Sequence, residues 1–145
     1  MSTCTFFGHR ECPIEIKEKL RAEIEKLILQ GVDVFYVGHQ GHFDGYAHSI
    51  LKELSARYPH IIYTVILAYL PTERKDAMDY SDTMFPEGME SVPPRFAISH
   101  RNRWMLEHSD ICVCYIHHTW GGAYQFALQA KRNGKKIINL GNLQI

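Results

Sequence analysis

Three apolar segments of this chain end in glycine and polar residues whose types suit ligand binding. Gly8, His9 and Arg10 follow "CTFF", the stretch "GHQGHFDG" follows "VDVFYV", and "HHTWGG" follows "ICVCYI". Glycine lets a backbone approach a ligand closely, the N-terminus of a following helix attracts anions, and arginine can contact a phosphate through two hydrogen bonds. Together these features predict a nucleotide or sugar-phosphate site, whereas any one glycine turn is equally well explained by local turn geometry.

We therefore expect one ligand-binding site to which these segment ends contribute. Trp120 could stack on a base, and His9 fits either a hydrogen bond to the ligand or a structural one. Asp44 and Arg101 are the candidates for catalysis if the ligand is turned over, but the residues alone identify no catalytic group. The candidate binding residues are Gly8, His9, Arg10, Gly38, Gly41, Asp44, Gly45, Arg101, Trp120, Gly121 and Gly122.

Asp44 and Arg101 each have two interpretations. Asp44 lies at the expected start of a helix, and we favour an N-cap role over contact with a ribose hydroxyl or a part in chemistry. Arg101 lies in an expected helix over 95–107. It could reach a phosphate or glycosidic oxygen, or it could lie on a solvated face in salt bridges.

The nine histidines raise the question of a metal ion. Several of them fall near the expected site, namely His39, His42, His48, His117 and His118. Neither an HExxH nor a CxxC motif is present, so we expect no metal site and no required cofactor beyond a possible nucleotide-type ligand.

Apolar segments that alternate with amphipathic ones must position these residues. Strands are expected over 4–7, 32–37, 61–70, 110–116 and 135–140, and helices over 13–30, 44–58, 95–107 and 123–132, with a long irregular stretch over 71–94. Strands that are apolar throughout are typical of a parallel sheet covered on both faces. We predict one α/β domain over 1–145, a three-layer Rossmann-like fold with a roughly five-stranded parallel sheet and helices on both faces, which binds its ligand at the carboxyl ends of the strands.

Composition narrows the class of protein. Lys and Arg together number 16, as do Asp and Glu, and a neutral chain of this kind makes nucleic-acid binding a weak first guess. The longest apolar run, over 61–70, is too short to span a bilayer, and no signal peptide is expected. The four cysteines, Cys4, Cys12, Cys112 and Cys114, fit buried reduced thiols in a cytoplasmic protein.

Four stretches in order, "FFGHR", "GHFDGYAHSIL", "RNRWMLEHSDICVCYI" and "GGAYQFALQAKRNGKKIINL", resemble the SLOG superfamily, named after DprA/Smf and the LOG proteins. The resemblance covers almost the whole chain and is greatest to the short YpsA-like branch, the DUF1273 proteins. It implies a Rossmann-like domain that binds a nucleotide or nucleotide-derived small molecule. It also implies a homo-oligomer, with a dimer expected because related domains commonly form homodimers. The family's glycine and arginine positions carry over to Gly8, Arg10, Gly38, Gly41, Asp44, Gly45, Arg101, Gly121 and Gly122.

The chain departs from the LOG phosphoribohydrolases within this resemblance. Those enzymes carry an arginine that matches Arg101 and a PGGxGTxxE motif, but here Trp120 replaces the proline and Leu128 replaces the glutamate. A carboxylate usually stabilises the oxocarbenium-like state of N-glycosidic cleavage or activates water, and leucine can do neither. Asp44 could substitute, as could a carboxylate of the long loop such as Asp76, Asp79 or Asp82.

Three functions follow in order of preference. The first is a binding or sensor domain for a nucleotide derivative. The second is an N-glycosidase, phosphoribohydrolase or deoxyribosyltransferase-like enzyme that acts on nucleotides. The third is single-stranded DNA binding, which the neutral charge disfavours.

Overall fold

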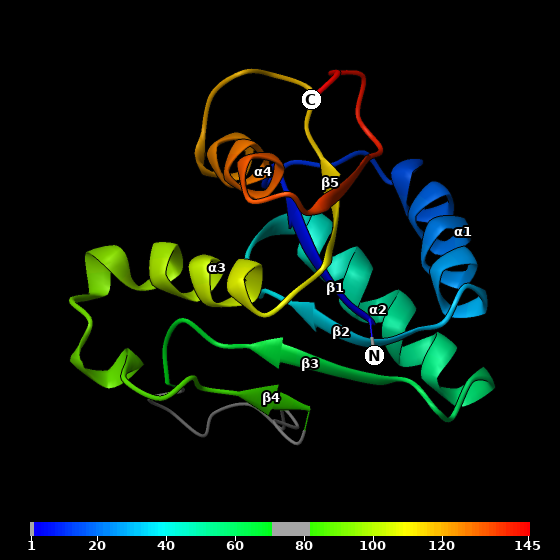
Figure 1. The fold of residues 1–145 in the computed structure, drawn as a ribbon, viewed down its shortest axis with the longest axis horizontal. Coiled ribbons are helices and arrows are strands. Elements are labelled where there is room, and N and C mark those ends of the chain that lie inside the picture. Colours follow the sequence, from blue (N-terminus) through cyan, green and yellow to red (C-terminus); the bar gives the residue numbers. More distant parts are fainter. Residues whose placement is uncertain (1, 71–81) are drawn as a thin grey trace.

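The computed structural model of the chain describes residues 2–70 and 82–145. Within these residues, six parallel strands form one sheet in the order β4-β3-β2-β1-β5-β6 (Figure 1). The strands are β1 (Ser2–Gly8), β2 (Val32–Val37), β3 (Ile62–Ile66), β4 (Thr83–Met84), β5 (Ile111–Tyr115) and β6 (Lys136–Asn139). The helices are α1 (Ile16–Leu29), α2 (Gly41–Arg57), α3 (Ala97–Glu107) and α4 (Gly122–Arg132), with short 3-10 helices at Met89–Ser91 and Pro94–Phe96.

The predicted α/β Rossmann-like fold with a parallel sheet and helices on both faces is confirmed, with one strand more than expected. The additional strand is β4, which lies within the stretch 71–94 that was predicted to be irregular. Its two residues pair with Val65 and Ile66 of β3. A segment of two residues is too short to show a hydrophobic periodicity, so only its pairing with β3 identifies it as a strand. Residues 71–81 of that stretch lie outside the described residues.

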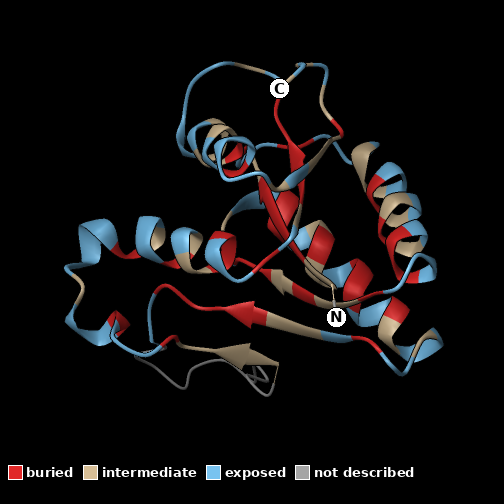
Figure 2. Cartoon of the chain, in the orientation of Figure 1, coloured by how far each residue is buried: buried red, intermediate tan, exposed pale blue. Residues whose placement is uncertain are grey.

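Successive side chains of the central strands point to opposite layers. Cys4 and Phe6 of β1 pack in the core that contains the buried residues of α1 and α2, whereas Phe7 packs in the core that contains those of α3 and α4. Figure 2 shows buried positions along the central strands and on the inner sides of the helices. The sheet is therefore hydrophobic on both faces, which is why its strands do not read as alternating in the sequence.

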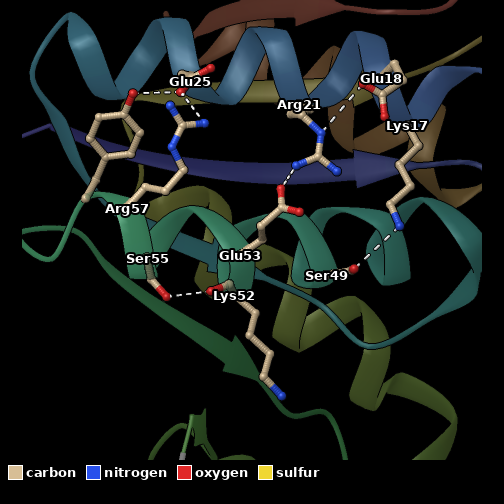
Figure 3. Close-up of polar contacts among 10 residues, drawn as sticks. Lys17, Glu18, Arg21, Glu25, Ser49, Lys52, Glu53, Ser55 and Arg57 are labelled. Atoms are coloured by element: carbon tan, nitrogen blue, oxygen red, sulfur yellow. Dashed lines mark hydrogen bonds and ion pairs between the residues drawn. The ribbon is translucent and has the colours of Figure 1, made fainter.

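Polar contacts join α1 and α2 on the side that faces away from the sheet (Figure 3). Arg21 forms an ion pair with Glu53. Glu25 accepts a hydrogen bond from the Tyr58 hydroxyl at 2.6 Å and pairs with Arg57 at 3.3 Å. These exposed or half-buried contacts supplement the apolar packing of this layer and contribute little free energy individually.

All four cysteines lie in the described residues, and each is buried with a free thiol. Burial raises the pKa of the Cys12 thiol to about 11 and raises the pKa of Cys4 further. The expectation of buried, unpaired thiols is confirmed. Among the described helices, none has the length and apolar character that crossing a membrane requires.

The order of the strands creates the place where a ligand can bind. The chain builds outward from β1 through β2 and β3 to β4, and then returns to place β5 on the other side of β1. The chain that follows β1 crosses to one face of the sheet, and the chain that follows β5 crosses to the other. This divergence opens a crevice between the carboxyl ends of the two strands.

Candidate functional site

A cavity of about 610 Å³ lies at the carboxyl ends of β1 and β5. Its wall is formed by the end of β1 and the loop after it, the loop after β2, the first turn of α2, α3, the loop after β5 and the first turn of α4. Eight of the residues predicted from the sequence line it: Gly8, His9, Arg10, Asp44, Arg101, Trp120, Gly121 and Gly122. The site predicted from strand ends is thus brought together around one cavity.

Gly38 in the loop after β2 and Gly41 and Gly45 in the first turns of α2 do not belong to the cavity wall. A Cβ at Gly38 would lie 2.7 Å from Asp44 Oδ2 and 3.0 Å from Arg101 Cζ. A Cβ at Gly41, where φ is +86°, would lie 2.7 Å from the Cα of Arg10. Gly45 has open space around its Cβ position. Gly38 and Gly41 therefore make room for other residues of the site, and the structure gives Gly45 no such role.

Gly8 both lines the cavity and makes room for a neighbouring side chain. A Cβ there would overlap the Phe43 ring and lie 2.6 Å from the Phe43 Cβ. The loop after β1 is also joined directly to the first turn of α2, because the backbone N–H of His42 donates to the carbonyl of Arg10 at 2.8 Å. The side chain of Arg10 remains exposed beside the cavity.

Asp44 and Arg101 form the buried polar part of the wall. Asp44 is 8% exposed, and its Oδ2 accepts the backbone N–H of Gln40 at 2.9 Å. Arg101 is 1% exposed and donates to the Ile66 carbonyl at 3.1 Å and to Asn102 Oδ1 at 2.7 Å. The interpretation of Arg101 as part of a solvated face is wrong, since the side chain is buried and lines the cavity.

The N-cap interpretation of Asp44 is also wrong. Helix α2 begins at Gly41 with Gln40 as its N-cap, so Asp44 lies inside the first turn. Its carboxylate instead reaches back to the N–H of the N-cap residue, in the manner of the acidic residue of a capping box. The sequence placed the helix start too late because Gly41 and His42 were assigned to the preceding loop.

Burial shifts the pKa of both members of this pair. It raises the pKa of Asp44 to about 6, although the Gln40 N–H and the Arg101 guanidinium oppose the shift. Burial likewise lowers the pKa of Arg101, which Asp44 opposes by its negative charge. A carboxyl with a pKa this close to neutrality, in a cavity wall, can hold or release a proton there.

Three aromatic side chains form a stack from the interior to the surface. The rings of His9 and His118 stack at 3.5 Å, and those of His118 and Trp120 stack at 3.7 Å. His9 is 7% exposed and accepts the backbone N–H of His117 at Nε2, whereas Trp120 is 68% exposed. This hydrogen bond from His117 supports the structural interpretation of His9.

The N-terminus of α4 opens onto the same cavity. Gly121, with φ +94°, is its N-cap, and no side chain among the described residues caps it. A Cβ at Gly122 would meet nothing within 4 Å. The first backbone N–H groups of a helix have no partner within that helix and carry a partial positive charge, so this end can hold an anion.

Several residues of the wall were not among the sequence candidates: Gln40, Asn102, His117 and His118. His117 and His118 follow β5 after Ile116, and the sequence had placed both near the expected site without choosing them as binding residues. Gln40 and Asn102 adjoin candidate segments but have no distinctive motif. Leu128 is not part of this wall, Asp82 pairs with His48 at 2.8 Å, and Asp76 and Asp79 lie outside the described residues.

No known family model matches the sequence, and no curated protein matches it. Among solved structures, DNA processing protein A (DprA) from Streptococcus pneumoniae is similar, with a TM-score of 0.71 at 15% sequence identity. The match covers 95% of this chain and 50% of that protein, so this chain spans about half the length of DprA. The likeness shows that the two share the Rossmann-like fold.

Proposed function

We propose that this chain is a SLOG-type domain of the YpsA-like branch that binds a nucleotide or nucleotide-derived small molecule in the cavity at the carboxyl ends of β1 and β5. The observation that carries the proposal is that this cavity has an open helix N-terminus, an exposed arginine and a stacked aromatic face together in its wall. Its volume of about 610 Å³ lies in the range of small-molecule sites.

Each part of such a ligand has a chemically suitable group. The first turn of α4, at Gly121 and Gly122, and the side chain of Arg10 suit the phosphates. The exposed indole of Trp120, supported from below by His118, suits a base. The fold shared with DprA supports a SLOG-type domain in general, and the four-motif resemblance to the SLOG superfamily implies the nucleotide class of ligand. The cytoplasmic location and the homodimer remain expectations alongside it.

Thermal unfolding with a panel of nucleoside mono-, di- and triphosphates and nucleotide sugars tests the proposal. A ligand present at 100 times its dissociation constant stabilises the native state by about 2.7 kcal/mol, or roughly 5–10 °C for a chain of this size. We expect such a shift for at least one nucleotide, with EDTA present throughout. We expect Arg10→Ala and Trp120→Ala to reduce the shift.

The matched control is Arg103→Ala, which removes an exposed arginine of α3 outside the cavity wall. It should leave the ligand-induced shift unchanged. A panel without any stabilising nucleotide, or an equal loss in the Arg103 variant, would contradict the proposal. Affinity for single-stranded DNA that falls steeply with salt would favour the DNA-binding alternative instead.

The enzyme alternative has one observation in its favour, which is the buried carboxyl of Asp44 beside Arg101 in the cavity wall. A carboxyl with a pKa of about 6 can act as an acid or a base in N-glycosidic cleavage or transfer. Release of free base from the nucleotide that stabilises the protein, lost in Asp44→Asn, would establish it. Stabilisation without base release supports the binding function.

A further inference from the structure

Three histidines from two neighbouring strands converge at the cavity. His9 directly follows β1 and His117 and His118 follow β5, which pairs with β1 through the register Gly8↔Tyr115. One nitrogen atom of each ring lies within 4.8 Å of the others. The ring centroids of His117 lie 4.7 Å from those of both His9 and His118. All three side chains line the cavity.

One ring nitrogen of this cluster lacks a hydrogen-bond partner among the described residues. The Nδ1 atom of His118 is buried and has no hydrogen-bond partner among residues 2–70 and 82–145. A buried polar atom without a partner is unfavourable and calls for a specific explanation, such as an ion. His9 is buried as well. The neutral imidazole, with a free lone pair on one ring nitrogen, is the form of histidine that ligates metals.

We propose that His9, His117 and His118 form a binding site for one divalent transition-metal ion, with an open coordination position that faces the cavity. Neutral imidazoles suit Zn²⁺, Co²⁺, Ni²⁺ and Cu²⁺ rather than Mg²⁺ or Ca²⁺, which prefer oxygen. Three protein ligands leave a fourth tetrahedral position for water or for an oxygen of a bound ligand, in contrast to a closed structural site. This inference does not depend on the nucleotide proposal.

Metal binding requires His9 and His118 to leave their stacked arrangement, in which the two rings are within 18° of parallel, because an ion lies close to the plane of each imidazole that ligates it. Nitrogen ligands of tetrahedral Zn²⁺ lie about 3.4 Å apart, given bonds of about 2.0–2.1 Å. The nitrogens within 4.8 Å must therefore draw together slightly. A neutral imidazole has one free lone pair, and His9 Nε2 uses its lone pair to accept the His117 N–H. The ion must replace that hydrogen bond, so the backbone amide of His117 should report binding.

The direct test is titration of chelator-treated, dialysed full-length protein with ZnCl₂ by calorimetry and with CoCl₂ by visible absorption. We expect one ion per chain, the visible bands of tetrahedral Co²⁺, and a shift of the His117 amide resonance on addition of Zn²⁺. The variants His117→Gln and His118→Gln should each weaken Zn²⁺ binding at least about tenfold.

The matched control is His60→Gln, an exposed histidine before β3 at the amino edge of the sheet, which should leave the affinity unchanged. His117 is also exposed, so its variant should fold, and circular dichroism checks this for all three. The proposal is overturned if no stoichiometric binding occurs, or if the folded His117 and His118 variants bind as tightly as the unchanged protein. Since the nucleotide panel is run in EDTA, failure here leaves that result standing, and the reverse also holds.

Discussion

At the scale of single residues, the environment of Asp44 differs sharply from that of a surface carboxylate. Asp44 is buried against the Gln40 N–H and attracts Arg101, but burial outweighs both influences and raises the pKa of Asp44 to about 6. The folded protein therefore binds a proton at Asp44 that the unfolded chain, with a pKa near 3.8, has already lost. Stability must depend on pH between these two values.

We predict that Asp44→Asn raises the free energy of unfolding at pH 7 by about 2–3 kcal/mol relative to the unchanged protein. The proton held by folded Asp44 stabilises the native state fully below pH 4, and this stabilisation is lost as pH rises through about 6. Asparagine keeps an acceptor for the Gln40 N–H and has no such loss. Urea unfolding of both proteins at a series of pH values from 4 to 8 measures the difference.

The two stabilities should approach each other as pH falls to 4 and converge below the unfolded pKa of 3.8, where Asp44 is protonated in both the folded and the unfolded states. The buried groups that face Asp44 are the Arg101 guanidinium and the Gln40 N–H, and both remain in the variant. A difference that does not change across this pH range would show that the carboxyl titrates normally in the folded protein.

At the scale of the elements, glycines set how closely β1, α2 and the neighbouring loops approach each other. Gly8 lets the end of β1 pack against Phe43 in the first turn of α2. The polar contacts between α1 and α2 in Figure 3 lie on the outer side of that layer and do not determine this approach. The position of α2 against β1, and with it the position of Asp44, depends on the missing side chain at Gly8.

We predict that Gly8→Ala destabilises the protein by about 1–3 kcal/mol because the new methyl group overlaps the buried Phe43 ring. Gly45→Ala is the matched control, since Gly45 lies in the same helix as Phe43 but has open space at its Cβ position. That variant should be neutral or more stable by up to about 1 kcal/mol, because alanine favours the helix. Denaturant unfolding measures both, and equal effects would contradict the packing argument.

At the scale of the whole molecule, β1 is the strand on which the site depends. It pairs with β2 on one side and β5 on the other, and both cores contain its side chains. The strand-order reversal beside it opens the crevice that contains the cavity. The edge strand β4, by contrast, has two residues that pair with β3. A rigid centre therefore supports the site, while the sheet edge is only weakly held.

We predict that backbone amides of β1 and β5 exchange hydrogen with solvent most slowly and that those of β4 exchange fastest among the strands. Phe6 and Val113, which are paired and fully buried, should be protected to nearly the free energy of global unfolding. Hydrogen exchange followed by NMR or mass spectrometry provides the measurement. Equal protection of Met84 and Phe6 would contradict this account of where the fold is stable.

Much of the architecture was predictable because local patterns carry it. Apolar runs such as "VDVFYV" and helical spacing such as that of Leu20, Ile24, Leu27 and Ile28 depend only on neighbours along the chain. These patterns predicted five of the strands and the four main helices. They missed β4, which exists through its pairing with β3, and they placed the start of α2 at Asp44 instead of Gly41.

The sequence by itself determined the parallel α/β class and three loops that meet at one edge, with Arg10, Trp120, Gly121 and Gly122 among their exposed residues. Only the tertiary structure decided which distant residues contact those loops. It buried Arg101 beside Asp44, kept Gly38, Gly41 and Gly45 out of the cavity wall, and brought His9 to His117 and His118, which no spacing motif predicts. The physical reason is that periodicity shows which face of an element is buried, whereas strand order and close packing choose the distant residues that the face meets.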